Sequence, residues 1–212
     1  KKSIENIQCI LYRKGMEQSI GVSKEKEFKK NESRPLIENL DDLPRIPYSL
    51  INIDKYSPIG YRPGRKSMAL VLSRGCPFRC GFCSVVQLYD RTFRHYSISR
   101  IIEDLIFLDE EYGVKDFFFM DDHIAFDQKH FAELVKTLAN VNRDWAWGAA
   151  GIRADAVLRL SDETMSNLVK SGCKNLDIGV ESGNRRILDL IKKDTNLDII
   201  SRANKKLSKY PI

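Results

Sequence analysis

The sequence has few cysteines, few histidines and no long apolar run. Its 212 residues include five cysteines and three histidines. No stretch of about 18 apolar residues occurs, which excludes a membrane-spanning helix. Residues 1–13 are charged and carry no apolar signal-peptide region, so we expect a cytoplasmic protein. Five unevenly spaced cysteines are also too few for a disulfide scaffold, which agrees with a reducing compartment.

The remaining composition is that of an ordinary globular protein. Hydrophobic residues make up 42% of the chain, which is enough for a sizeable core, and 30% of the residues are charged. The formal net charge of +6 is a mild surplus that permits an anionic partner without arguing for one. We therefore do not expect a nucleic-acid partner. The length corresponds to one or two domains.

The first 66 residues differ from the rest. Residues 8–13 and 19–22 have the pattern of a small hairpin, and the charged stretch 24–34 is typical of a solvated loop. Residues 34–50 (RPLIENLDDLPRIPYSL) contain three prolines, which oppose a long helix or a central strand. We predict an N-terminal hairpin and a proline-rich interdomain linker over residues 1–66, with the linker extended over a surface.

From residue 67 to 212, short apolar runs alternate with helical patterns. Strands are expected at residues 68–72, 116–120, 145–150 and 175–180, and helices at 98–112, from Asp127, from Ser161, at 187–191 and at 199–207. This alternation predicts an α/β fold with a parallel sheet of about four βα units. Residues 210–212 have the pattern of a fifth strand, so we expect a fragment of a larger barrel that is truncated after about four units.

The most informative feature is the spacing CxxxCxxC, formed by Cys76, Cys80 and Cys83. One alternative is a helix with three buried thiols on one face. Two glycines and a proline between residues 75 and 81 favour a loop instead. A loop that gathers three thiolates is typical of an iron–sulfur cluster.

Zinc is the competing metal for these thiols. A structural zinc site needs four ligands, and no fourth cysteine or histidine lies nearby at zinc-finger spacing. His95 is the nearest candidate, in a different segment. Three cysteines on a four-iron cluster leave one iron without a protein ligand, which is typical of a catalytic site.

Polar side chains follow each later strand of the expected sheet. Asp121 and Asp122 follow the second strand, Arg153 follows the third, and Glu181 and Ser182 follow the fourth. In α/β barrels the active-site groups lie just beyond the carboxyl ends of the strands. Each residue alone also has a local interpretation, as a turn, a cap or a surface ion pair. Together they predict one polar rim beside the cysteine loop.

These motifs resemble those of the radical S-adenosylmethionine (SAM) superfamily. CxxxCxxC with an aromatic residue, here Phe82, before the last cysteine is the signature of that superfamily. The resemblance implies a partial (β/α) TIM-type barrel and a [4Fe-4S] cluster on Cys76, Cys80 and Cys83. It also implies that the open iron binds SAM, whose one-electron reduction gives a 5′-deoxyadenosyl radical.

The resemblance also implies roles for the polar rim. Asp121 and Asp122 stand where the superfamily has the glycine-glycine-glutamate motif that binds the amino group of SAM. Arg153 would reach the carboxylate of SAM, and Glu181 or Ser182 its ribose hydroxyls or methionine end. Phe82 would lie near the adenine.

Residues 34–212 as a whole resemble the cobalamin-binding branch of the superfamily. The segments that carry this resemblance are RPLIENLDDLP, RGCPFRCGFCS, FFFMDD, IRAD and IGVESGN. The branch implies a methyltransferase or ring-forming enzyme, with cobalamin held by a domain outside this chain. The cobalamin signature DxHxxG is absent from these residues. The resemblance further implies a small-molecule or peptide substrate and a reductant such as flavodoxin or ferredoxin.

Two other functions stay open at this point. An RNA methylthiotransferase shares CxxxCxxC but should carry a second set of three cysteines upstream, where Cys9 stands alone. A non-catalytic iron–sulfur electron-transfer module would hold the cluster without cleaving SAM.

Overall fold

The computed structural model describes residues 4–13, 28–56 and 61–212. By its internal contacts the chain divides into two compact units, Lys1–Glu38 and Asn39–Ile212. The second unit contains the parallel sheet and every cysteine except Cys9.

The first unit contains a small antiparallel ladder. β1 (Leu11–Arg13) pairs with β2 (Phe28–Lys30). The expected first strand, residues 8–13, contains β1, whereas its expected partner, residues 19–22, lies outside the described residues. The assignment of residues 24–34 to a loop is wrong at β2. The β2 side chains are nevertheless exposed, because main-chain pairing does not require them to be apolar.

The proline-rich segment forms single turns of 3-10 helix instead of a plain extended linker. Such turns span Leu40–Asp42, Tyr48–Leu50 and Ile53–Lys55, and a fourth, in the first unit, spans Ile4–Asn6. The three turns of the second unit each bury one apolar side chain, those of Leu40, Tyr48 and Ile53. The second compact unit therefore begins at Asn39, whereas the sequence analysis started the core at residue 67.

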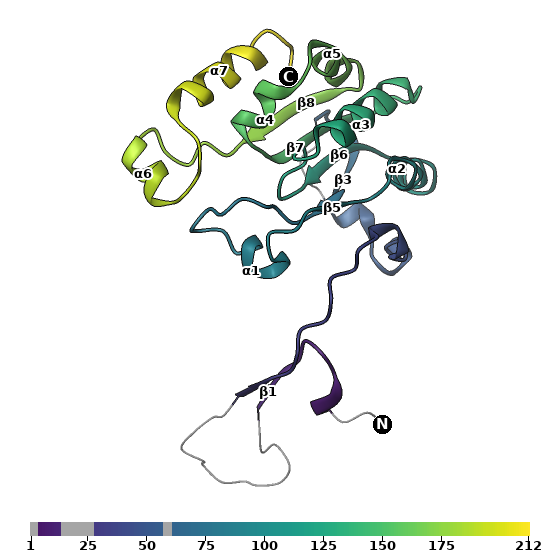
Figure 1. The fold of residues 1–212 in the computed structure, drawn as a ribbon. Helices are drawn as coiled ribbons and strands as arrows, with labels where there is room; N and C mark the ends of the chain where they lie inside the picture. Colours follow the sequence, from purple (N-terminus) through teal and green to yellow (C-terminus); the bar gives the residue numbers. More distant parts are fainter. Residues whose placement is uncertain (1–3, 14–27, 57–60) are drawn as a thin grey trace. The chain divides into compact units, whose positions relative to one another are not determined.

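Four parallel strands form the centre of the second unit in the order β3-β6-β7-β8 (Figure 1). They are β3 (Lys66–Leu70), β6 (Val114–Met120), β7 (Ala146–Ile152) and β8 (Cys173–Ile178). The longer helices are α2 (Ile98–Tyr112), α3 (Gln128–Asn140), α5 (Asp162–Lys170) and α7 (Leu197–Leu207). The predicted α/β class with parallel strands is confirmed. The strands form an open sheet, and no closed barrel occurs among the described residues.

The helix boundaries follow the local signals in the sequence. Ser97 caps α2 by accepting a hydrogen bond from the Arg100 N–H, and Gly113 ends the helix in the left-handed conformation at φ 70°. Asp127 and Ser161 cap α3 and α5 in the same way. These three helix starts are predicted correctly, because capping depends only on residues near each end.

Several short elements are not predicted from the sequence. They are β4 (Ser73–Arg74), β5 (Arg94–His95), α1 (Val85–Tyr89) and α4 (Ala154–Arg159). α6 (Arg185–Leu190) covers most of the helix expected at residues 187–191. The fifth strand expected at residues 210–212 does not form, and the side chains of Tyr210 and Ile212 pack against the core instead.

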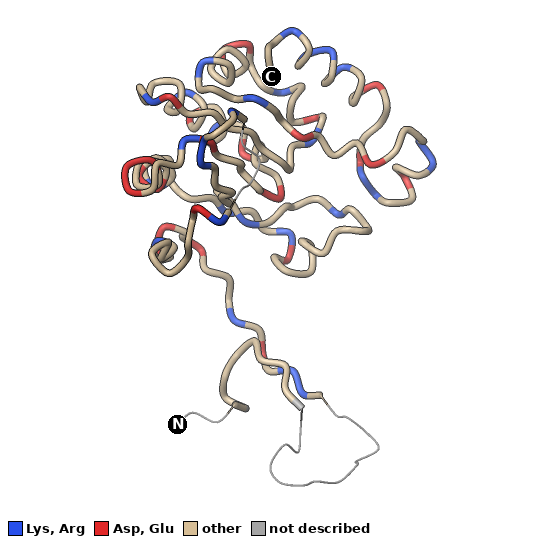
Figure 2. The backbone as a smooth tube through the Cα atoms, turned by 180° about the vertical axis from the view of Figure 1, so that it is seen from behind, with Lys and Arg blue, Asp and Glu red and all other residues tan. Residues whose placement is uncertain are grey.

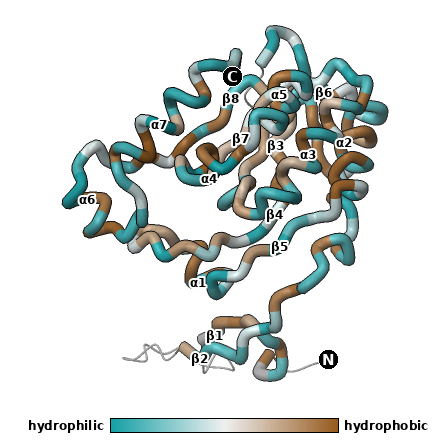
Figure 3. Tube along the Cα trace, turned by 45° about the horizontal axis from the view of Figure 1, so that its top comes forward, coloured by the Kyte–Doolittle hydropathy of each residue, from teal (hydrophilic) through white to brown (hydrophobic). Residues whose placement is uncertain are grey.

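One face of the sheet and the helices that cover it form the main core. Phe117 contacts Trp145 with ring centroids 5.6 Å apart, and Phe119 contacts Trp147 at 5.2 Å. Figure 3 shows α7 changing between hydrophilic and hydrophobic residues along its length, as expected of a helix with one buried face. This packed layer supports the loops that follow the carboxyl ends of the strands.

Positive and negative residues are interspersed over most of the second unit, and acidic residues gather on α2. Figure 2 shows this helix as a largely red coil, while blue and red segments mix along the rest of the tube. None of the described helices is both long and apolar enough to cross a membrane.

Candidate functional site

A cavity of about 380 Å³ lies between the cysteine loop and the carboxyl ends of β6, β7 and β8. Cys76, Cys80 and Cys83 all line it. So do Asp122 after β6 and Arg153 after β7, together with Gly179, Glu181 and Lys193 from β8 onwards. The predicted convergence of the cysteine loop with groups from three strand ends is therefore present.

The cysteine loop connects β4 to α1 and is not helical, as the sequence analysis expected. The Gly75 N–H donates a hydrogen bond of 2.9 Å to Oδ2 of Asp122. Gly75 has φ +92°, and a Cβ built there would lie 2.2 Å from the carbonyl oxygen of Thr92. Only glycine fits this position, since a side chain would meet both strain and a backbone clash.

The three thiols interact electrostatically. Burial raises the pKa of Cys76, and the neighbouring Cys80 and Cys83 raise it further. No three His, Cys, Asp or Glu side chains in the described part of the chain lie close enough together to hold one metal ion. Three thiols of one loop that line a shared cavity are the kind of donor set that an iron–sulfur cluster uses, whereas a structural zinc site needs a fourth ligand.

The structure separates the two neighbouring carboxylates. Asp121 is 5% exposed, and its Oδ1 accepts hydrogen bonds from the Leu72 N–H (3.1 Å) and the Ser73 hydroxyl (2.5 Å). Burial raises the pKa of Asp121 to about 7. Asp122 lines the cavity, whereas Asp121 does not. Asp121 thus joins β6 to the end of β3.

Arg153 is largely engaged by the protein itself. Its Nε donates to Oδ1 of Asp155, and its two terminal nitrogens donate to the carbonyls of Lys193 and Asp194, each at 2.9 Å. The guanidinium carbon lies 3.7 Å from the ring centroid of Phe78 in the cysteine loop. Arg153 therefore lines the cavity while it joins three segments of the chain.

Glu181 forms an ion pair at the cavity wall. Its Oε1 lies 2.7 Å from Nζ of Lys193, and the backbone of Glu181 is left-handed at φ +63°. A Cβ built on Gly179 would lie 2.7 Å from the carboxylate and 2.9 Å from the ammonium, so the pair rests against this glycine. Ser182 is not part of the cavity wall, and its hydroxyl accepts from the Asn184 N–H at 3.1 Å.

His123 is buried beside the cavity. Its ring centroid lies 5.6 Å from that of Phe78, and neither ring nitrogen has a hydrogen-bond partner among the described residues. Burial lowers the pKa of His123 to about 4. The His123 imidazole is therefore enclosed and neutral near pH 7.

Comparison with known proteins identifies the family. The sequence profile of the Radical SAM superfamily matches residues 70–212. The chain belongs to the radical SAM superfamily. The matched region begins at the end of β3 and includes the cysteine loop, all later strands and the whole cavity.

Named relatives of this radical SAM chain are methyltransferases and cyclases. The chain is 32% identical over 176 residues to an uncharacterized methyltransferase of Pyrococcus horikoshii, covering 81% of this chain and 37% of the relative. It is 30% identical over 182 residues to the cytidylyl-2-hydroxyethylphosphonate methyltransferase of Streptomyces wedmorensis, covering 82% and 33%. The chain thus spans about a third of the length of these relatives.

Solved structures with the same fold are radical SAM enzymes as well. The cobalamin-dependent SAM radical enzyme OxsB matches with a TM-score of 0.65 at 21% identity, covering 88% of this chain and 27% of that chain. The radical SAM methyltransferase TsrM of Kitasatospora setae matches with a TM-score of 0.59 at 12% identity, covering 69% and 29%. These likenesses confirm the fold of a partial TIM-type radical SAM barrel.

Some residues of this radical SAM site are not predicted from the sequence. Phe78, Asp177, Gly179 and Lys193 line the cavity but were not among the candidates. Asp177 carried a usable signal, because it is a carboxylate within the expected strand 175–180, near the carboxyl end of the sheet where site residues lie. Lys193 carried none, since it follows a helix and a turn.

Proposed function

We propose that this chain is the core of a radical SAM enzyme that holds a [4Fe-4S] cluster on Cys76, Cys80 and Cys83. This core would cleave SAM within a cobalamin-dependent methyltransferase or a related ring-forming enzyme. The observation that carries the proposal is the shared cavity, in which three thiols face polar groups from three strand ends. The methyltransferases and cyclases among the relatives support it.

Cys76, Cys80 and Cys83 would hold the cluster, which would supply the electron for the reductive cleavage of the SAM sulfonium to methionine and a 5′-deoxyadenosyl radical. The protein's part is to hold the thiolates and exclude water. Cys76 is half-buried, and Gly75 fixes the start of the loop through Asp122. A pre-organised loop keeps the reacting groups in place without reorganisation during the reaction.

The cavity offers matching groups for the parts of SAM. The Asp122 carboxylate suits the amino group, and Glu181, with Ser182 close by in sequence, suits the ribose hydroxyls or the methionine end. Phe82 lines the cavity with a ring that is 57% exposed, which suits stacking on the adenine. Asp121 would fix the position of Asp122 through its hydrogen bonds to Leu72 and Ser73, outside the cavity.

Cobalamin would be held by a domain outside this chain. The likeness to OxsB, whose structure is described with aqua-cobalamin and SAM bound, supports this part of the proposal. We propose a small-molecule or peptide substrate and a reductant such as flavodoxin or ferredoxin. If the full-length protein shows no corrinoid absorption and turns over without added cobalamin, the cobalamin part of the proposal is refuted and the rest is unaffected.

The decisive assay is the formation of 5′-deoxyadenosine. Protein reconstituted anaerobically with iron and sulfide and then reduced should convert SAM to methionine and 5′-deoxyadenosine. The Cys80→Ala variant is the control that should form none. A non-catalytic electron-transfer module would give an intact cluster and no 5′-deoxyadenosine from the wild-type protein.

A further inference from the structure

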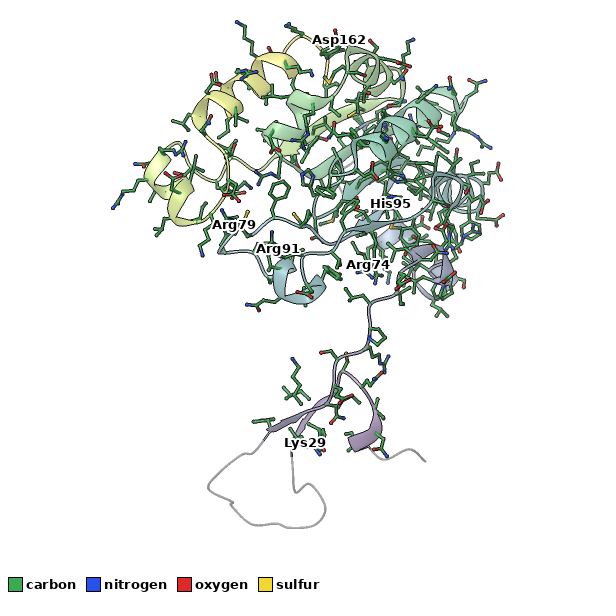
Figure 4. All side chains as sticks on the ribbon, viewed as in Figure 1. Lys29, Arg74, Arg79, Arg91, His95 and Asp162 are labelled. Carbon is green, nitrogen blue, oxygen red and sulfur yellow. The ribbon has the colours of Figure 1, made fainter. Side chains whose placement is uncertain are left out.

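Residues 191–195, between α6 and α7, lie against the cysteine loop; we name them the latch segment. The Gly81 N–H donates a hydrogen bond of 2.8 Å to the carbonyl of Ile191. Nε and the Nη2 terminal nitrogen of Arg79 donate to the two carboxylate oxygens of Asp194 at 3.1 and 3.3 Å. Figure 4 shows Arg79 on the strip of chain beside α6. A segment more than 100 residues away in sequence thus holds the loop of cluster ligands.

The latch segment has an unfavourable backbone. Lys192 and Asp194 are both left-handed, at φ 54° and 50°. Non-glycine residues rarely adopt this conformation, and they keep it only where the surroundings impose it. The carbonyl groups of Lys193 and Asp194 both point to one group, the guanidinium of Arg153, with hydrogen bonds of 2.9 Å each.

Arg153 is itself held rigidly. Its side chain is 8% exposed, Asp155 accepts from its Nε, and the ring of Phe78 covers one face of its guanidinium. The planar guanidinium has donors in a fixed fork, and three of them bind three different acceptors here. Arg153 therefore joins the end of β7, the cysteine loop and the latch segment at one point.

We propose that Arg153 is a positioning residue that acts on SAM binding through the latch segment. It holds the Lys193 and Asp194 carbonyls so that the Lys193 ammonium pairs with Glu181 at the cavity wall, at 2.7 Å. This inference rests on the proposed function, since it concerns the same cavity. It replaces the direct contact between Arg153 and the SAM carboxylate that the family resemblance implies.

The close packing of the ion pair makes it sensitive to the latch segment. Gly179 leaves no room behind the pair, because a single added carbon would lie within 3 Å of both charged groups. Lys193 also lies over the ring of Phe82, with Nζ 5.9 Å from its centroid. Loss of the two hydrogen bonds from Arg153 to the Lys193 and Asp194 carbonyls would let the left-handed backbone relax. The Lys193 ammonium would then move away from Glu181 and Phe82.

The first test is Arg153→Lys in the reconstituted protein, measured for iron content and for the dissociation constant of SAM. A lysine keeps the charge but cannot bind two carbonyls and Asp155 together. We expect iron content within 20% of wild type and SAM binding at least tenfold weaker. The matched control is Arg159→Gln, which removes the other cationic partner of Asp155, at 2.8 Å, without touching the latch segment. Its SAM affinity should stay within twofold of wild type.

A double-mutant cycle separates positioning from direct contact. If Arg153 acts through Lys193, then Arg153→Lys added to Lys193→Met should weaken SAM binding by no more than a further twofold. If the fold-losses in SAM affinity caused by the two single substitutions multiply in the double variant, Arg153 acts independently of Lys193 and the proposal is overturned. Failure of wild-type protein to bind SAM would instead refute the proposed function.

The cofactor-free protein provides an independent readout. Hydrogen exchange over residues 191–196 should rise at least tenfold in Arg153→Lys and stay unchanged in Arg159→Gln. Unchanged exchange in Arg153→Lys overturns the proposal even if SAM is never added. If Arg153→Lys does not fold, Asp155→Ala carries the test, because it removes an acceptor of the Arg153 guanidinium from outside the cavity. An unaltered SAM affinity and exchange rate in Asp155→Ala would then overturn the proposal.

Discussion

Individual side chains at the cavity face opposing electrostatic demands. Burial and mutual repulsion raise the pKa of Cys76, yet metal ligation requires thiolates. Cationic Arg153 acts in the other direction and lowers that pKa. A positively charged iron centre would stabilise the three thiolates, so the loss of one cysteine should weaken the binding of the whole cluster.

Cys80→Ala should abolish the ~400 nm absorption of the reconstituted cluster, because one iron would lose its protein ligand. The control is Cys173→Ala, which replaces a buried cysteine of β8 that does not line the cavity. That variant should keep the absorption and the iron content. A cluster that persists in Cys80→Ala would contradict the ligand assignment.

Asp121 should make stability depend on pH. Its pKa is raised from 3.8 to about 7 by burial, so the folded state holds a proton that the unfolded state has lost between these values. The free energy of unfolding should therefore fall as pH rises from about 4 to 7, by up to about 4 kcal/mol from this residue. Asp121→Asn keeps an acceptor for Leu72 and Ser73, and it should reduce the slope of the unfolding free energy against pH. Urea unfolding at pH 4.5 and 7.5 measures the difference, and equal slopes in both proteins would refute the assignment.

Glu181→Ala should weaken SAM binding about tenfold while iron content stays near that of the wild type. The reason is that Lys193, which is 8% exposed, would lose its 2.7 Å partner and turn away from its position. Equilibrium dialysis with SAM and an iron assay on the same sample check both parts. Unchanged affinity would remove Glu181 from the site.

At the scale of elements, the connection from β4 to α1 depends on tight backbone contacts. Gly75→Ala should destabilise the folded protein by about 2 kcal/mol or more and lower the iron content, because the new Cβ meets the Thr92 carbonyl at 2.2 Å. Gly183→Ala is the matched control, since nothing lies within 4 Å of a Cβ there. Thermal unfolding and iron content measure both variants. Equal behaviour of the two would contradict this account of the loop.

Elements whose signals are local are also those that the sequence predicts well. α2 begins after Ser97 and ends at Gly113 as expected, and α3 begins after Asp127. β4 and β5 escape prediction because each has two residues and exists only through pairing with the other. α4 escapes because it spans six residues and begins without a side-chain cap.

At the scale of the whole molecule, the position of the boundary between the two units is testable. Removal of residues 1–38 should leave the unfolding midpoint of the second unit within about 3 °C, because the compact unit begins at Asn39. Removal of residues 1–66 should lower stability by several kcal/mol, since it deletes the buried side chains of Leu40, Tyr48 and Ile53. Calorimetry compares the two proteins. Equal midpoints would instead support the boundary at residue 66 that the sequence suggests.

The parallel α/β fold, the cysteine loop and the family are predictable from the sequence. Those features depend on periodicity, caps and motif spacing, which are properties of neighbouring residues. Which groups face the cavity, in contrast, depends on the tertiary structure. In the folded chain, Asp121 points away from Asp122 and accepts a hydrogen bond from Leu72. Arg153 donates to the carbonyl of Lys193, 40 positions later in the sequence, and the Lys193 ammonium pairs with Glu181. Side-chain direction at a strand end depends on partners distant in sequence, and no local pattern encodes them.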